Sequence, residues 1–243
     1  MATVRCEVWG AALSTLQPAH HFWASVWERD RAAAFRRPED RARSLLAAVL
    51  LRAVVARYLG IEPTDVTVDR SCSRCGAAHG RPIIDGGPSV SVSHSGDLVV
   101  VAATEHAPIG VDIEAIVHAD FADVASTCFT STERIQLSSP RDVLVGWTRK
   151  EAYLKATGEG LTVPLTDVRV SSPSAPAALL ERAGGSTVSC AMADLHKWDR
   201  HVGTVAVLGA ESVHVVERDA LGVLAAAAHA GERHTRPSPA PDA

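Results

Sequence analysis

The sequence predicts an α+β protein whose two halves, of similar size, meet near residue 115. A long helical pattern precedes strand-like segments in the first half, and helical patterns precede short strand-like segments in the second. The chain has 243 residues, of which 47% are apolar, so it can bury a sizeable core. We assign residues 1–114 to the first half and residues 115–227 to the second. Residues 228–243 are rich in His, Pro, Ala and Arg without periodicity, and we expect them to be disordered.

Two helices and one strand are expected before residue 60. Residues 38–59 place apolar side chains at helical spacing, and Gly60 ends the pattern. Residues 18–35 mix aromatic and charged side chains and contain the other helix. Residues 3–9 alternate loosely, as a strand does.

A meander of three strands is expected next. The strands cover residues 89–94, 98–103 and 109–113, and turns at residues 95–97 and 105–108 connect them. Each strand of a meander pairs with the next one along the chain, so all three would lie in one sheet.

The second half is expected to begin with helices and to end with strands. Residues 121–137 form a helical region, and residues 142–157 form a helix that Gly158 closes. Short strands are expected at residues 168–170, 187–191 and 203–208.

The composition argues against several classes of function. There are 24 Lys and Arg against 28 Asp and Glu, and the net charge of −4 argues against unselective nucleic-acid binding. The longest apolar runs are far too short to span a membrane, and the N-terminus lacks the pattern of a secretion signal. An odd number of cysteines, five, without such a signal indicates reduced thiols. We therefore expect a cytoplasmic protein that binds neither nucleic acid nor membrane.

Asp112 and Glu114 form the first group that can carry chemistry. They are two residues apart in an expected strand, so their side chains project from the same face. Two such carboxylates repel each other unless a cation or hydrogen-bond donors neutralise them. Mg²⁺ prefers hard oxygen ligands and completes its shell with water and phosphate oxygens. The alternative is a solvent-exposed strand face that carries two acids.

Two further acids each allow two interpretations. Glu133 matches a capping box with Thr130 as the N-cap, and it could instead be a third metal carboxylate. Glu151 and Lys155 lie four residues apart on one helix face, which is typical of an exposed ion pair. The same pair could act as a general base and a phosphate-binding ammonium, because a neighbouring cation holds a carboxylate in its ionised form.

Basic side chains offer candidate phosphate ligands. His94 ends a strand beside a glycine turn, where it could donate to a phosphate oxygen or be a structural histidine. Arginines also cluster near the start of the long helix, although acids are interspersed among them. The cluster consists of Arg29, Arg31, Arg36, Arg37, Arg41 and Arg43.

Cys72, Cys75 and His79 resemble half of a structural zinc site, because a C-x₂-C-G pattern is followed by a histidine. A closed site needs a fourth ligand, and no second Cys or His pair follows at the usual interval.

Together these segments resemble the Sfp-type 4′-phosphopantetheinyl transferases, in the order and spacing of that family. The matching segments are residues 91–96, 110–114, 129–133 and 147–161. Residues 80–82 and the start of the long helix add a weaker match. The combination of D-x-E with a later W-x-x-K-E-x-x-x-K is specific, and the resemblance covers about residues 30–165.

The resemblance implies an enzyme that moves the phosphopantetheine arm of coenzyme A onto a serine of an apo acyl or peptidyl carrier protein. Adenosine 3′,5′-bisphosphate would be released. The carrier would serve fatty-acid, polyketide or nonribosomal-peptide biosynthesis. The resemblance also implies a pseudo-dimer of two similar α+β halves in one chain, with the active site and coenzyme A in the cleft between them, and we expect a monomer.

The resemblance assigns roles to individual residues as well. Asp112, Glu114 and Glu133 would hold Mg²⁺ against the pyrophosphate of coenzyme A, and Glu151 would deprotonate the carrier serine. The ligands of the phosphates and the adenine end would be Arg31, Arg43, Ser44, Arg81, Ser93, His94, Lys150 and Lys155, of which His94 and Lys155 also act in catalysis. Some relatives have a basic residue at position 28, where this chain has Glu28. Binding of the 3′-phosphate of coenzyme A would therefore depend more on Arg31. We expect residues 121–137 to contact the carrier.

Two other functions fit part of the sequence. A zinc-knuckle protein would use Cys72, Cys75 and His79, with the arginine cluster on nucleic acid, but the net charge of −4 weighs against it. A Mg²⁺-dependent phosphodiesterase would use the same three acids to hydrolyse coenzyme A without a carrier, and it gives Glu151 no particular role.

Overall fold

The computed structural model describes residues 3–72, 75–105, 107–117, 121–184 and 188–225, without the side chain of residue 161. The expected tail at residues 228–243 lies outside the described residues. Within the described ranges, no helix is both long and apolar enough to cross a bilayer.

The chain before residue 105 forms three strands, two α-helices and short 3₁₀ turns. In order, these elements are β1 (Thr3–Ala12), 3₁₀ turns at Leu13–Thr15 and Pro18–Trp23, α1 (Val26–Ala33), α2 (Pro38–Leu59), a 3₁₀ turn at Pro63–Asp65, β2 (Ser89–Ser95) and β3 (Leu98–Thr104). The helix expected over residues 38–59 is confirmed, and Gly60 ends it in the left-handed conformation at φ 66°.

The rest of the chain alternates short helices and strands around one long helix. These elements are β4 (Ile109–Ala115), α3 (Ala122–Cys128), α4 (Ser131–Arg134), α5 (Pro140–Thr157), 3₁₀ turns at Gly160–Thr162 and Leu165–Asp167, β5 (Val168–Val170), β6 (Leu179–Arg182), β7 (Cys190–Leu195), β8 (His201–Leu208) and β9 (Ser212–Asp219). Helix α5 confirms the helix expected at residues 142–157 and begins two residues earlier, because Ser139 is its N-cap.

The strands form two main sheets instead of one meander. The first sheet has the order β2-β3-β1-β9, the second has the order β4-β8-β7, and β5 and β6 form a small third sheet. The expected meander is wrong in its last step, because β1 pairs with the free edge of β3 and β4 pairs with β8. The C-terminal strand β9 pairs in parallel with β1. The boundary between the two halves at residues 114 and 115 stays a prediction. In the sheets, β4 belongs with strands of the second half, and β9 belongs with strands of the first half.

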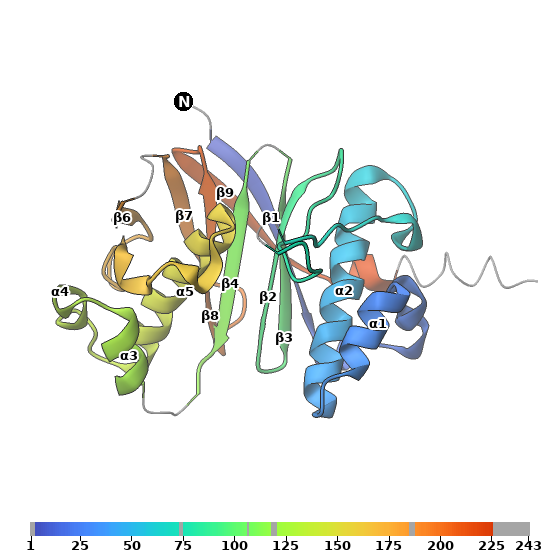
Figure 1. Ribbon diagram of the computed structural model, residues 1–243, viewed down its shortest axis with the longest axis horizontal. Coiled ribbons are helices and arrows are strands. Elements are labelled where there is room, and N and C mark those ends of the chain that lie inside the picture. The colour runs from blue at the N-terminus through green and yellow to red at the C-terminus, as the bar shows by residue number, and fades with distance from the viewer. Residues whose placement is uncertain (1–2, 73–74, 106, 118–120, 185–187, 226–243) are drawn as a thin grey trace, which may run out of the picture.

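The two main sheets pack face to face between two long helices (Figure 1). Along β1, Cys6 and Val8 point into the core between the sheets, whereas Trp9 and Ala11 join the core under α2. On the other side of the molecule, α5 covers the outer face of β4 and β8. The protein is therefore α+β with two similar halves, each a sheet backed by one long helix, as expected.

Gly110 sets the distance between α5 and the second sheet. A Cβ atom at this position would lie 2.0 Å from the carbonyl oxygen of Ala152, so glycine is required for this close packing. The close approach brings Lys155 of α5 to within 2.7 Å of Asp112 on β4. A single small residue of β4 thus positions the polar side chains of α5.

Candidate active site

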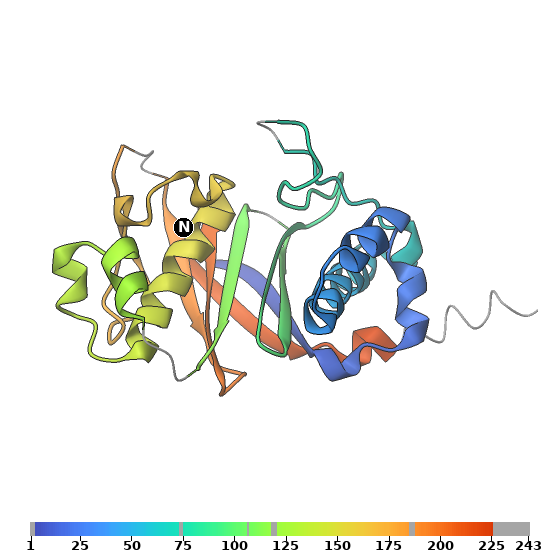
Figure 2. The same cartoon turned by 60° about the horizontal axis from the view of Figure 1, so that its bottom comes forward.

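Serine side chains join the two halves where β2 and β4 meet. These strands lie side by side at the centre of the molecule in both views (Figures 1 and 2). Ser91, Ser93 and Ser95 alternate along β2, so their hydroxyl groups share one side of the strand. Each hydroxyl oxygen accepts a hydrogen bond from a backbone N–H of β4. The donors are Val111, Ile113 and Ala115, at 3.0, 3.4 and 3.0 Å.

The same serine row holds the two acids of β4. Ser93 Oγ donates to Asp112 Oδ1 at 2.8 Å, and Ser95 Oγ donates to Glu114 Oε2 at 2.7 Å. Lys155 Nζ donates to Asp112 Oδ1 at 2.7 Å and to Ser93 Oγ at 3.0 Å. The acids predicted to share a face are therefore fixed by donors from β2 and α5, at the junction of the halves.

Glu151 of α5 forms an acidic cluster with Asp112 and Glu114. Burial raises the pKa of Glu151, and the negative charges of Asp112 and Glu114 raise it further, while Lys155 opposes them. Burial also raises the pKa of Glu114, with a contribution from Asp112. The three carboxylates therefore interact through their negative charges, without all of their ligand atoms lying within 4.8 Å of one another.

Two oxygens of the acidic cluster are buried without a partner. In the described part of the chain, Asp112 Oδ2 and Glu151 Oε1 have no hydrogen-bond donor. A buried carboxylate oxygen without a donor is unfavourable, and a cation or a proton would satisfy it. Hard carboxylate oxygens are the ligands that Mg²⁺ prefers, so this donor set fits that ion.

Glu133 is held by a helix cap and by the ammonium group of Lys150. Its carboxylate closes the predicted capping box, accepting from the backbone N–H of Thr130 at 2.9 Å, and forms an ion pair with Lys150 Nζ at 2.9 Å. In the described chain, neither Glu133 nor Glu151 joins Asp112 and Glu114 in a group whose ligand atoms all lie within 4.8 Å of one another. Glu133 has a cap and a buried ammonium as partners, and its grouping with Asp112 and Glu114 around a metal stays a prediction.

Lys150 is closed off from any ligand in this structure. Its side chain is fully buried, and Nζ donates to Glu133 and to the carbonyl oxygens of Cys128 and Leu165, each at 3.0 Å. All three of its N–H donors are thereby used. Lys150 thus ties α5 to the chain around α4, and its expected contact with coenzyme A stays a prediction.

Three residues assigned from the sequence line one recess of about 160 Å³. They are Arg31, Ser44 and His94. Arg70 lines the recess too, and the sequence reasoning missed it. Burial, and then the nearby charge of Arg31, lowers the pKa of Arg70, so the two positive charges act on each other there. Such a pair is suited to an anion with several charges.

Glu28, the acidic residue that lines this recess, is paired with Arg52. Glu28 Oε2 accepts from Arg52 Nε at 2.8 Å and from the backbone N–H of Ser25 at 2.7 Å. The carboxylate of Glu28 is thus hydrogen-bonded by Arg52 and Ser25, and it offsets only part of the charge of Arg70, whose pKa remains lowered.

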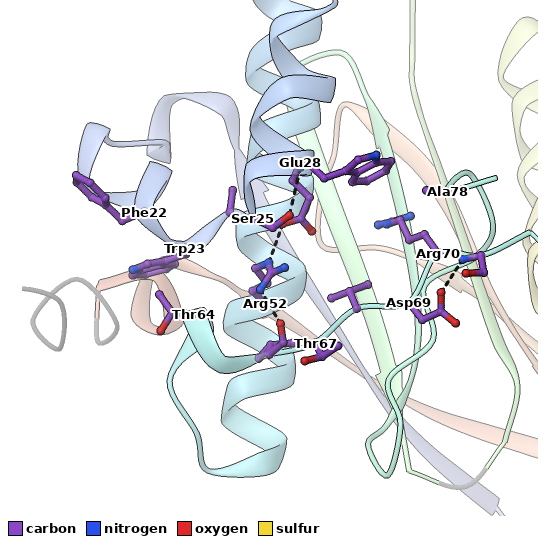
Figure 3. Close-up of a pocket in the computed structure, with 15 residues that line it drawn as sticks. Phe22, Trp23, Ser25, Glu28, Arg52, Thr64, Thr67, Asp69, Arg70 and Ala78 are labelled. Carbon is purple, nitrogen blue, oxygen red and sulfur yellow. Dashed lines mark hydrogen bonds and ion pairs between the residues drawn. The ribbon is translucent and has the colours of Figure 1, made fainter. Parts of the chain in front are cut away.

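A larger hollow of about 450 Å³ adjoins the recess, since Trp27, Glu28 and Arg70 line both. Figure 3 shows the pair of Glu28 and Arg52 at one wall of the hollow and Arg70 at another. Its volume lies in the range of small-molecule sites.

His94 links the recess to the acidic cluster. Partial burial lowers the pKa of His94, and the positive charges of Lys155 and Arg43 lower it further. His94 thus lies near a lysine that contacts Asp112 and near an arginine at the start of α2.

Arg43 and Arg81 do not line the recess. Arg43 Nε donates to the carbonyl oxygen of Gly96 at 2.8 Å and so holds the turn between β2 and β3. Arg81 Nη1 donates to the carbonyl oxygen of Ala156 at 3.3 Å, which ties a loop of the first half to the end of α5.

Comparison with known proteins identifies the family. Residues 108–206 match the family described as the 4′-phosphopantetheinyl transferase superfamily, and residues 6–106 match "4′-phosphopantetheinyl transferase, N-terminal". The chain is 32% identical to 4′-phosphopantetheinyl transferase HetI of Nostoc sp., over 75% of this chain and 77% of that protein.

Two further relatives match over a shorter region. Identity is 30% to 4′-phosphopantetheinyl transferase gsp of Aneurinibacillus migulanus, over 60% of this chain and 62% of that protein. It is also 30% to 4′-phosphopantetheinyl transferase Sfp of Bacillus subtilis, over 59% and 64%. The chain thus belongs to the Sfp-type 4′-phosphopantetheinyl transferases and is an enzyme of that family.

Proposed function

We propose that this enzyme transfers the 4′-phosphopantetheine arm of coenzyme A to a serine of an apo acyl or peptidyl carrier protein, with Mg²⁺, and releases adenosine 3′,5′-bisphosphate. The observation that carries the proposal is the acidic cluster of Asp112, Glu114 and Glu151 next to a recess lined by Arg31 and Arg70. A pyrophosphate ester needs a cation where it is cleaved and guanidinium groups where its other phosphate is held. We propose that it acts as a cytoplasmic monomer.

Asp112 and Glu114 would hold Mg²⁺ in this proposal, and Glu151 is the third acid of the same cluster. The buried oxygens Asp112 Oδ2 and Glu151 Oε1, which lack a hydrogen-bond donor, support this assignment. Glu133 Oε1 also lacks a hydrogen bond, but it lies 2.9 Å from Lys150 Nζ. When bound, the ion would neutralise the charge of the pyrophosphate oxygens. The sequence-based alternative, Glu133 as the third ligand, requires its ion pair with Lys150 to open.

Glu151 would also accept the proton of the carrier serine. A carboxylate placed beside the reacting hydroxyl group can act as a general base, and Glu151 Oε1 is buried without a hydrogen-bond donor. The serine Oγ would form a bond to the phosphorus, and its proton would pass to Glu151. The bond from phosphorus to the bridging oxygen would break, and adenosine 3′,5′-bisphosphate would leave with the electron pair. Lys155 would stabilise the negative charge that develops.

The recess would receive the 3′-phosphate of coenzyme A. Arg31, Arg70, Ser44 and His94 supply donors there, and the adjoining hollow has room for part of the nucleotide. Arg43 and Arg81 would support the site without lining the recess. Arg43 would hold the β2–β3 turn, and Arg81 would hold the loop that reaches α5. Ser93 would hold Asp112 and Lys155 in place.

The carrier protein would contact residues 121–137. Ile135, immediately after α4, has 84% of its side chain exposed, which is unusual for an isoleucine. An apolar side chain in this position fits a helical partner with an apolar contact surface.

The experiment incubates the protein with coenzyme A, Mg²⁺ and an apo carrier protein, then measures the mass of the carrier. We expect the carrier to gain the mass of one phosphopantetheine group at its serine. A control carrier with that serine replaced by alanine should gain nothing. Hydrolysis of coenzyme A in the absence of a carrier, with no mass gain in its presence, would contradict the proposal and favour a phosphodiesterase.

A further inference from the structure

Cys72, Cys75 and His79 form a cluster that the transfer reaction does not use. Their ligand atoms all lie within 4.8 Å of one another, and Cys75 Sγ lies 3.0 Å from His79 Nε2. In the described ranges, this is the one group of at least three His, Cys, Asp or Glu side chains with such spacing. We propose that the three side chains bind one Zn²⁺ ion, with solvent as the fourth ligand.

The backbone brings the ligands together without a metal. The N–H of Gly76 donates to the carbonyl oxygen of Cys72 at 2.8 Å, and the N–H of Cys72 donates to the carbonyl oxygen of Ala77 at 2.9 Å. Gly76 has a φ of 74°, a left-handed conformation that glycine adopts at little cost. The chain therefore turns sharply after Cys75, and an ion would find its ligands already assembled.

The ligand set selects zinc over the magnesium of the proposed active site. Two thiolates and one imidazole are soft or borderline ligands, which suit Zn²⁺ and not Mg²⁺. The two thiolate charges would neutralise the ion. Zinc to ligand bonds of about 2.0–2.3 Å in a tetrahedron separate the ligand atoms by roughly 3.5 Å, so the contact between Cys75 and His79 needs to widen only slightly. Both of these side chains are exposed, which leaves the fourth position open to water.

The cluster lies at the tip of a loop that carries two arginines at its base. The N–H of Gly80 donates to the carbonyl oxygen of Arg70 at 2.7 Å, and Asp69 pairs with Ile83 through two backbone hydrogen bonds. Arg70 lines the recess, and Arg81 reaches the end of α5. A metal at the tip would therefore restrict both arginines, and this consequence rests on the proposed function.

The test measures zinc in the full-length protein, purified under reducing conditions and passed through a desalting column. We expect about one zinc per chain. Replacing the zinc with Co²⁺ should produce a thiolate-to-cobalt charge-transfer band. Cys75→Ser and His79→Asn should lose both signals, whereas Cys190→Ser, which alters a half-buried cysteine outside the cluster, should keep them.

Three results would overturn the site: no zinc and no cobalt band in the wild-type protein, a band that Cys75→Ser leaves unchanged, or a disulfide between Cys72 and Cys75 under reducing conditions. If a variant fails to fold, the cobalt band of the wild-type protein still decides the question. The zinc site and the proposed function fail separately, because a protein that holds one zinc and transfers nothing would retain the site and lose the function.

The effect of the metal on Arg70 and Arg81 can be measured separately. We expect Cys75→Ser to bind adenosine 3′,5′-bisphosphate several-fold more weakly than Cys190→Ser in calorimetric titrations. Equal affinities, with zinc lost from Cys75→Ser alone, would show that the metal does not restrict Arg70 and Arg81.

Discussion

Lys155 Nζ lies 2.7 Å from Asp112 Oδ1, and it also donates to Ser93 Oγ at 3.0 Å. One ammonium group therefore connects α5 and β4 of the second half with β2 of the first. The contact also pairs the carboxylate of Asp112 with a positive charge. The proposed metal site is thus assembled from both halves, and changes on either side of the junction should alter it.

Asp112→Asn should abolish Mg²⁺-dependent transfer and leave the protein folded. The amide has the same shape as the carboxylate but is a weak ligand for Mg²⁺, and its neutrality relieves repulsion from Glu114 and Glu151. Initial rates over a range of Mg²⁺ concentrations, with thermal unfolding curves, check this. Asp199→Asn, at an exposed position in the turn before β8, is the matched control. A wild-type rate and magnesium dependence for Asp112→Asn would contradict the assignment.

Glu151→Gln should stabilise the metal-free protein at neutral pH. Burial, with Asp112 and Glu114, raises the pKa of Glu151 in the folded state, so the ionised side chain opposes folding above that pKa. Each unit by which the pKa is raised corresponds to about 1.4 kcal/mol. The cost disappears when the pH falls below the pKa of the unfolded state, about 4.3, because both states are then protonated.

Urea denaturation of the wild-type protein and Glu151→Gln without metal, at about pH 7 and about pH 4, measures this difference. The gain in the free energy of unfolding should be present at the higher pH and absent at the lower. The control is Glu181→Gln, because Glu181 is 59% exposed. A loss of stability in Glu151→Gln at neutral pH would show that the carboxylate is not under the electrostatic repulsion described above.

Arg70→Gln should weaken the binding of adenosine 3′,5′-bisphosphate by about tenfold, because a hydrogen bond to a charged group contributes about 1.5 kcal/mol. Calorimetric titration measures the affinity. Arg169→Gln removes an exposed arginine of the other half and should have no effect. An unchanged affinity for Arg70→Gln would exclude the recess as the 3′-phosphate site.

Ile135→Asp should raise the KM for the carrier several-fold and leave the affinity for coenzyme A unchanged. The side chain is 84% exposed, so the substitution removes an apolar contact with a partner without disturbing a core. Leu221→Asp, at a leucine after β9 that is 57% exposed, serves as the control. If Ile135→Asp and the control give the same carrier kinetics, the carrier docks elsewhere.

The local elements could be predicted from the sequence, whereas the pairing of the strands could not. The periodic pattern of residues 38–59 and the alternation of Ser91, Ser93 and Ser95 depend only on neighbours along the chain. Strand β9 was missed, because its pairing with β1 joins segments about 200 residues apart and leaves no local signal. The expected meander is wrong for the same reason. Strand β1, far away in the sequence, pairs with the edge of β3 that β4 was expected to occupy.

The candidate site shows the same limit. The alternation in β4 predicts that Asp112 and Glu114 share a face, and the helical pattern predicts the same of Glu151 and Lys155. Sequence motifs do not show which way a side chain turns, so the mutual ion pair of Glu133 and Lys150 was not foreseen. Arg70 was missed because it belongs to no motif, although it lies two residues before Cys72, and Arg81 lies two residues after His79.

Binding of Mn²⁺ in place of Mg²⁺, followed by electron paramagnetic resonance in the presence of coenzyme A, tests the membership of the acidic cluster most directly. If Glu151 shares an ion with Asp112 and Glu114, Glu151→Gln should weaken Mn²⁺ binding by about tenfold or more, while Glu133→Gln changes it little. Weakened binding in a folded Glu133→Gln variant, with wild-type binding in Glu151→Gln, would contradict the account.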